Sequence, residues 1–111
     1  MDLRIYTLTH KKFDAPPDST YVPLHVGRAY AKDLGFMGDD TGENISEQNC
    51  YYSELTGHYW IWKNDRSSRY VGTCHYRRYL LNEHERIFTK DELLNLLGEC
   101  DLITTKKVLL N

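Results

Sequence analysis

The stretch from Tyr70 to Tyr79 reads YVGTCHYRRY, and it changes abruptly from apolar to basic. Its first part is aromatic, β-branched or small, which predicts a buried strand. His75, Arg77 and Arg78 follow where that strand should end. Ligands of open α/β sheets bind outside the carboxyl ends of the strands, and a guanidinium forms a planar fork that matches phosphate oxygens. The stretch therefore predicts a phosphate-bearing ligand at this edge of a sheet.

Composition bounds the fold and excludes several classes of function. A chain of 111 residues forms one domain at most. A net charge of -2, from 14 basic and 16 acidic side chains, gives no overall basic field and disfavours a general nucleic-acid binder. The 3 cysteines are widely spaced and lack a CxxC motif, which argues against a disulfide framework or a structural zinc site and favours a reducing compartment.

No long apolar run and no signal-like N-terminus occur in the sequence, so no transmembrane segment is predicted. We expect a cytoplasmic protein. Such a protein can still act on lipid-linked substrates at the inner face of the membrane.

A second β-prone run, LRIYTLT from Leu3 to Thr9, also ends in basic residues. It is the predicted first strand of a parallel sheet. Lys11 and Lys12 follow it, and the simplest interpretation of these two lysines is a solvated loop. The next residues, Phe13 to Thr20, form a proline-broken loop, and residues 22–31 carry only a weak signal for a short strand and a helical turn.

Asp39 and Asp40 lie in a predicted loop from Leu34 to Glu43, and they invite a metal interpretation. Carboxylates suit Mg²⁺ or Mn²⁺. The spacing lacks the EF-hand pattern, however, and Asp, Gly and Asn are what any turn before a helix would use. Metal binding is therefore the weaker of the two interpretations.

The longest predicted helix spans Glu47 to Lys63, with Ser46 as its N-cap. Apolar residues recur along it at helical spacing, which predicts one face laid on a sheet. That face consists of Tyr51, Leu55, Tyr59 and Trp62.

The opposite side of this helix is small and polar apart from one indole. It carries Asn49, Ser53, Thr56, Gly57 and Trp60. Small residues around Gly57 permit close packing. Trp60 among polar neighbours is a candidate for lining a pocket or for a sugar platform, although packing under a neighbouring loop is the favoured alternative.

Strand, long helix and strand in succession predict an α/β fold, a mostly parallel sheet with flanking helices. Further along, Thr89 with Glu92 three residues later forms a capping-box signature. A leucine-rich helix follows and should stop at Gly98. Cys100 to Thr104 then predicts another strand.

Three stretches together resemble a known family: IYTLTHKK from Ile5 to Lys12, DDTGENISEQNCYYSELTGHYWIWKN from Asp39 to Asn64, and YVGTCHYRRYL from Tyr70 to Leu80. The family is catalogued as domain of unknown function 4422. Its members occur among capsular and exopolysaccharide biosynthesis proteins and are regarded as glycosyltransferases of the GT-A type.

The resemblance implies the Rossmann-like, nucleotide-sugar-binding half of a GT-A-type fold. The implied donor is a UDP-sugar such as a UDP-hexose or UDP-galactofuranose, and the acceptor is a saccharide or a lipid-linked saccharide. The family domain is longer than this chain, so residues 1–111 are expected to form a single, incomplete domain, the N-terminal donor-binding half.

The family's functional positions can be carried over in part. In GT-A folds the end of the first strand meets the nucleotide, which would place Thr9, His10 and Lys11 near the base or ribose. A later strand usually ends in an Asp-x-Asp that holds the diphosphate through a divalent metal. The corresponding strand here ends in His75-Tyr76-Arg77-Arg78. Cationic side chains would neutralise the diphosphate directly, so a divalent metal is doubtful.

Strand alternation would put His75 and Arg77 on one side, unless the strand has already ended. These two residues are the first candidates for the donor site, with Arg78 bridging to a carboxylate. The alternative is that one arginine merely pairs with an acid such as Glu54 or Asp101.

Three further residues match family positions and are candidates for the same pocket: Asn44, Asn49 and Glu54.

A non-catalytic interpretation stays open. The chain would then be a remnant, or a protein-interaction module whose aromatic helix face docks a partner. An open sheet edge would favour a homo-oligomer. A third interpretation, RNA binding by the Tyr-rich and Arg-rich strand, is opposed by the overall acidity.

Overall fold

The computed structural model describes residues 3–82, 84–99 and 103. They belong to two compact units, Met1–Arg78 and Tyr79–Asn111. Each unit is described by itself.

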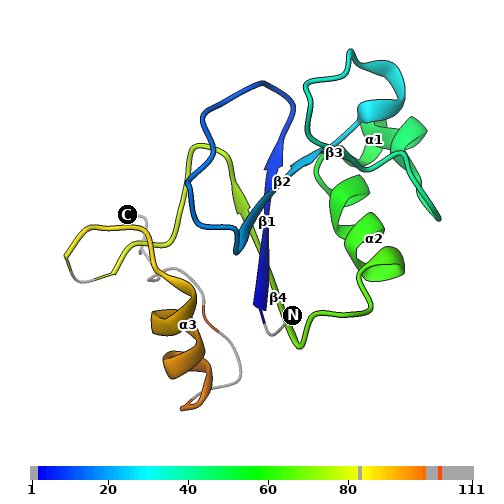
Figure 1. Ribbon diagram of the computed structural model, residues 1–111. Helices are drawn as coiled ribbons and strands as arrows, with labels where there is room; N and C mark the ends of the chain where they lie inside the picture. Colours follow the sequence, from blue (N-terminus) through cyan, green and yellow to red (C-terminus); the bar gives the residue numbers. More distant parts are fainter. Residues whose placement is uncertain (1–2, 83, 100–102, 104–111) are drawn as a thin grey trace, which may run out of the picture. The chain divides into compact units, whose positions relative to one another are not determined.

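The first unit is built on a four-stranded sheet, drawn as arrows in Figure 1. Its strands are β1 (Leu3–Thr9), β2 (Tyr21–His25), β3 (Met37–Gly38) and β4 (Tyr70–His75). They lie in the order β3-β2-β1-β4, and every neighbouring pair is parallel. The predicted α/β fold with a mostly parallel sheet is confirmed.

The helical elements of this unit are short. They are two 3-10 helices, η1 (Arg28–Tyr30) and η2 (Ser46–Gln48), and two α-helices, α1 (Asn49–Tyr52) and α2 (Leu55–Asn64). The continuous helix predicted from Glu47 to Lys63 is therefore wrong. The chain breaks between α1 and α2 at Ser53, whose φ of 50° and ψ of -128° are not helical.

The core lies between α2 and one face of the sheet. Its buried residues are Tyr6, Leu8, Leu24, Val26, Trp60 and Ile61. A Cβ added to Gly57 would lie 2.6 Å from Val26 Cγ1 and 3.1 Å from Leu8 Cδ2. The helix therefore approaches the sheet as closely as a glycine allows. Close packing around Gly57 was predicted, but on the side of the helix away from the sheet.

The predicted packing face of the helix is reversed. Tyr51, Leu55 and Trp62 are 83%, 58% and 70% exposed, whereas Thr56 is fully buried and Trp60 is 8% exposed. The sheet side of α2 carries small residues because the backbones come so close together. Trp60 and Ile61 of α2 are also buried in the core, whereas Leu55 and Trp62 lie on the outer side.

The second unit holds α3 (Lys90–Leu97) and an isolated bridge between Leu81 and Ile87. The predicted capping box is confirmed: Thr89 Oγ1 accepts from the Glu92 N–H at 3.2 Å, and Glu92 Oε1 accepts from the Thr89 N–H at 3.0 Å. The strand predicted for Cys100 to Thr104 lies outside the described residues, apart from residue 103.

Candidate functional site

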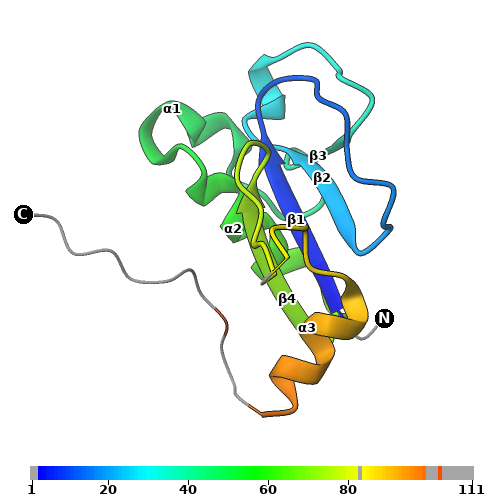
Figure 2. The ribbon, with the colours of Figure 1, turned by 90° about the vertical axis from the view of Figure 1, so that its left-hand side faces the viewer.

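The order of strands reverses between β1 and β4. From β1 the chain adds β2 and then β3 on one side, and β4 joins β1 on the other. Open α/β sheets bind ligands at such a switch point, outside the carboxyl ends of the strands. Figure 2 shows β1 and β4 running together, and Leu8 is the register partner of His75. The two strand ends that the sequence singled out therefore meet at one edge of the sheet.

A tight turn begins where β4 ends. The Arg78 N–H donates to the His75 carbonyl at 2.8 Å, and the Tyr76 N–H donates to the Leu8 carbonyl at 3.2 Å. The Arg77 N–H approaches His75 Nδ1 at 3.4 Å. Strand alternation thus ends at His75 and does not decide where the two arginines point.

The side chains of Arg77 and Arg78 are exposed. Among the described residues neither forms an ion pair, and the suggested pairing with Glu54 is not found. The other suggested partner, Asp101, lies outside the described part of the chain. Within the described part of the chain, the two guanidinium groups that follow β4 thus have no carboxylate that neutralises them.

An aromatic cluster joins the two strand ends. The ring of Tyr76 lies 5.8 Å from His10, 5.6 Å from Phe13 and 4.6 Å from His75, between ring centroids. The guanidinium carbon of Arg77 lies 5.2 Å from the Tyr76 centroid. We call these five residues the Tyr76 cluster. It connects the loop after β1 with the turn after β4.

At the end of β1, one polar side chain is buried and hydrogen-bonded within the chain, and the next two are exposed. Thr9 is buried, and its hydroxyl donates to the Lys11 carbonyl at 2.5 Å and accepts from the Lys11 N–H at 3.0 Å. The side chains of His10 and Lys11 are exposed. Both side chains, like that of Lys12, are open to a ligand at this strand end.

The carboxylate of Asp39 is fully buried and its oxygens are already occupied. They accept four hydrogen bonds, from the N–H groups of Gly27 and Arg28 and the hydroxyls of Ser46 and Thr56, at 2.9, 3.1, 2.5 and 2.7 Å. Four hydrogen bonds use the full acceptor capacity of a carboxylate. The weak prediction of Asp39 as a metal ligand is therefore corrected, and the residue has a structural role. Ser46, predicted as an N-cap, serves this network instead.

The other weak metal candidate, Asp40, is exposed. No three His, Cys, Asp or Glu side chains are grouped for a metal ion within the described residues.

Two of the further pocket candidates also support local structure. Asn44 Oδ1 accepts from the Ser46 N–H at 3.1 Å, and Asn49 Nδ2 donates to Thr56 Oγ1 at 3.0 Å. Glu54 is exposed just before α2 and its side chain makes no capping bond. No described contact brings these residues to the switch point.

Trp60 lies in the core rather than in a pocket. Its ring stands edge-on to Tyr6, with centroids 5.9 Å apart, and its Nε1–H donates to the Thr41 carbonyl at 3.0 Å. Trp60 is therefore not a sugar platform. It packs under the loop that contains Thr41, which was the alternative interpretation.

Sequence reasoning missed His25, the last residue of β2 and the register partner of Thr9. Its ring is 1% exposed, and neither ring nitrogen has a hydrogen-bond partner among the described residues. Burial, together with the nearby charge of Arg28, lowers the pKa of His25. The burial of His25 could not be predicted, because a single histidine at the end of a weakly predicted strand carries no sequence signal for it.

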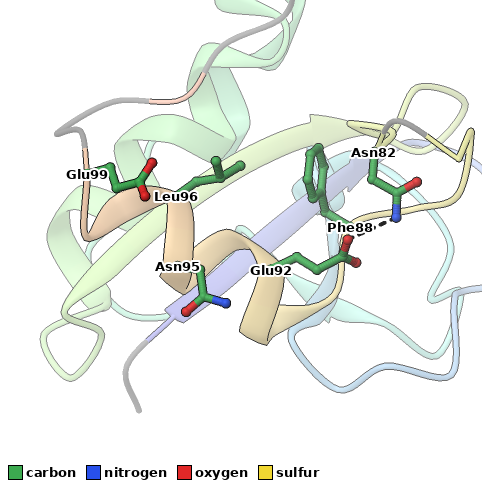
Figure 3. A pocket seen from close by; sticks show the side chains of 6 residues that line it. All are labelled: Asn82, Phe88, Glu92, Asn95, Leu96 and Glu99. Carbon is green, nitrogen blue, oxygen red and sulfur yellow. Dashed lines mark hydrogen bonds between the residues drawn. The ribbon is translucent and has the colours of Figure 1, made fainter.

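The second unit contains a hollow of its own. It is lined by Asn82, Phe88, Glu92, Asn95, Leu96 and Glu99, all labelled in Figure 3. Asn82 Nδ2 donates to Glu92 Oε2 at 3.0 Å across its polar side. None of the predicted site residues lines this hollow.

A family model described as Domain of unknown function (DUF4422) matches residues 4–111. The chain belongs to this family. Among solved structures, the apo form of the WbbM bifunctional glycosyltransferase is similar to this DUF4422 chain, with 48% identity and a TM-score of 0.68. The match covers 72% of this chain and 14% of that chain. The DUF4422 chain thus corresponds to a small part of that enzyme.

A search of curated proteins found no significant match. Within the described residues, no helix of the DUF4422 chain is long and apolar enough to cross a membrane.

Proposed function

We propose that this DUF4422 chain binds a nucleotide-sugar donor and forms the donor-binding part of a glycosyltransferase in bacterial capsular polysaccharide, exopolysaccharide or O-antigen biosynthesis. The observation that carries the proposal is the switch point between β1 and β4, where His10, Lys11, Arg77 and Arg78 project from two adjacent strand ends. The similarity to a bifunctional glycosyltransferase supports the reaction class.

In the proposed site the two arginines hold the diphosphate of a UDP-hexose or UDP-galactofuranose. Negative charge develops on the leaving diphosphate as the glycosidic bond breaks, and preorganised cations stabilise that charge. A guanidinium keeps its charge throughout the physiological pH range. The acceptor is a saccharide or lipid-linked saccharide, and the reaction takes place in the cytoplasm or at the inner face of the membrane.

Calorimetric titration with UDP, with and without EDTA, tests the donor site. Arg77→Ala should lose about 2 to 5 kcal/mol of binding free energy, the usual loss for truncating one partner of a desolvated charge pair. Arg69→Ala is the matched control, because Arg69 also lies over a tyrosine ring, that of Tyr70, but before β4 begins. It should bind UDP as the wild type does.

Each other outcome of this titration is informative. Binding that requires added Mn²⁺ would contradict the arginine clamp. A folded protein that binds no UDP would contradict the donor site altogether.

A second candidate function rests on the outer side of α1 and α2. Tyr51, Leu55 and Trp62 are largely exposed there, as a protein-interaction module with an aromatic helix face would require. Such a non-catalytic module would show no nucleotide preference. It would associate in a concentration-dependent way, and Trp62→Gln would weaken that association in sedimentation measurements.

A further inference from the structure

We propose that Tyr76 is a positioning residue, which holds the Arg77 guanidinium toward the diphosphate of the donor. The proposal rests on the proposed function and adds a role for a side chain that carries no charge. It starts from the position of the Arg77 guanidinium carbon, 5.2 Å from the centroid of the Tyr76 ring.

Arg77 needs an external constraint because it follows the end of β4 and is exposed. A free arginine side chain has many rotamers, and binding an anion would restrict them. The face of an aromatic ring attracts a guanidinium within about 6 Å. The Tyr76 ring therefore restricts the arginine before the ligand arrives, and less entropy is lost on binding.

The Tyr76 ring can serve this purpose because its own position is fixed from two directions. The backbone N–H of Tyr76 donates to the Leu8 carbonyl at 3.2 Å. Its ring packs on Phe13, which in turn packs on Phe36 with centroids 5.3 Å apart. The contact with His10, at an interplanar angle of 87°, comes from the end of β1. Both strand ends thus hold one ring.

The same turn also directs His75. Its Nδ1 faces the Arg77 N–H at 3.4 Å. When Nδ1 accepts this bond, a neutral imidazole carries its proton on Nε2 and can donate only from there. Arg77 and His75 then both offer donors, and the diphosphate offers only acceptors.

Titrations of UDP and uridine against two variants test the role of Tyr76. Tyr76→Leu removes the ring, while Tyr76→Phe keeps it. Tyr76→Leu should weaken UDP binding about fivefold, the effect of one exposed cation–π contact, and leave uridine binding unchanged. Tyr76→Phe should bind UDP like the wild type. In an Arg77→Ala background, Tyr76→Leu should have no further effect on UDP.

A ligand-free measurement keeps this proposal separate from the proposed function. The Arg77 Nε–H resonance in ¹H–¹⁵N NMR should show a ring-current shift in the wild type and in Tyr76→Phe, and lose it in Tyr76→Leu. Absence of the shift in the wild type would overturn the proposal, whether or not UDP binds. Equal losses of UDP and uridine affinity in Tyr76→Leu, or a loss in Tyr76→Phe, would also overturn it. A wild type that shows the shift but binds no UDP would refute the donor site, and with it the role of Tyr76 toward a diphosphate.

Discussion

The carboxylate of Asp39 lies fully buried beside Thr56, whose hydroxyl donates to Asp39 Oδ2 at 2.7 Å. The same hydroxyl accepts a bond of 3.0 Å from Asn49. A buried carboxylate is tolerated only when its oxygens accept hydrogen bonds. Asp39 follows β3, and Thr56 lies in the first turn of α2. This pair therefore ties the edge of the sheet to the helix that covers its face.

Thr56→Val should destabilise the protein by about 1.5 to 3 kcal/mol, the range for a hydrogen bond to a charged group. Valine nearly keeps the shape of threonine but leaves one Asp39 oxygen with a donor missing. Urea unfolding followed by circular dichroism measures the loss. Thr73→Val, at an exposed position of β4, is the matched control and should change stability little. Equal effects in the two variants would contradict the role of the Asp39 network.

The two tryptophans of α2 should respond very differently to truncation. Trp60→Ala removes a core residue and should cost about 3 to 5 kcal/mol. Trp62→Ala removes a ring that is 70% exposed and contacts Lys63, whose Nζ lies 3.9 Å from the ring centroid. That loss should stay near 1 kcal/mol or below. Similar losses in the two variants would show that the outer side of α2 is packed in solution.

The parallel sheet could be predicted, and so could the proximity of the carboxyl ends of β1 and β4, because both signals are local. LRIYTLT and YVGTCH are β-prone runs, each followed by basic residues, and parallel strands bring their carboxyl ends to one edge. The capping box at Thr89 is local in the same sense, and it too was predicted correctly.

The face of α2 could not be predicted because periodicity does not say which side meets the sheet. An apolar stripe at helical spacing fits burial and an exposed interaction surface equally well. The deciding fact is the close approach of α2 to Val26, which only Gly57 permits. That distance is a property of the folded chain and has no local signature.

The structural role of Asp39 could not be predicted from the sequence either, because it depends on residues that are distant along the chain. Its four donors come from residues 27, 28, 46 and 56, so no single stretch reveals them. An Asp in a Gly-rich and Asn-rich loop is as typical of a turn as of a metal site.

Gly57→Ala should destabilise the protein by about 1 to 3 kcal/mol, although alanine favours helices. The added Cβ would meet Val26 Cγ1 at 2.6 Å, and neither backbone can retreat without opening the core. Val26→Ala removes that methyl group, so Gly57→Ala should cost less in the Val26→Ala background. A double-mutant cycle by chemical unfolding measures the coupling. If Gly57→Ala proved stabilising alone, α2 would lie farther from the sheet.

The stability of the chain should depend on pH through His25. Burial and the charge of Arg28 lower its pKa in the folded state, so the unfolded state binds more protons near the ordinary value of 6.5. The free energy of unfolding should therefore fall as pH decreases through about 6.5, by at most about 1.4 kcal/mol per pH unit. The nearby charges of Asp39, Asp40 and Asp33 act in the opposite direction on the pKa of His25, and burial outweighs them.

His25→Leu should flatten this pH dependence and should not destabilise the protein at pH 8, because the ring nitrogens have no described partner to lose. Unfolding curves at several pH values measure both effects. His10→Leu, at an exposed position, is the control and should keep the wild-type slope. If His25→Leu kept the slope and lost more than about 2 kcal/mol at pH 8, the imidazole would be held by hydrogen bonds in solution, through a buried water molecule.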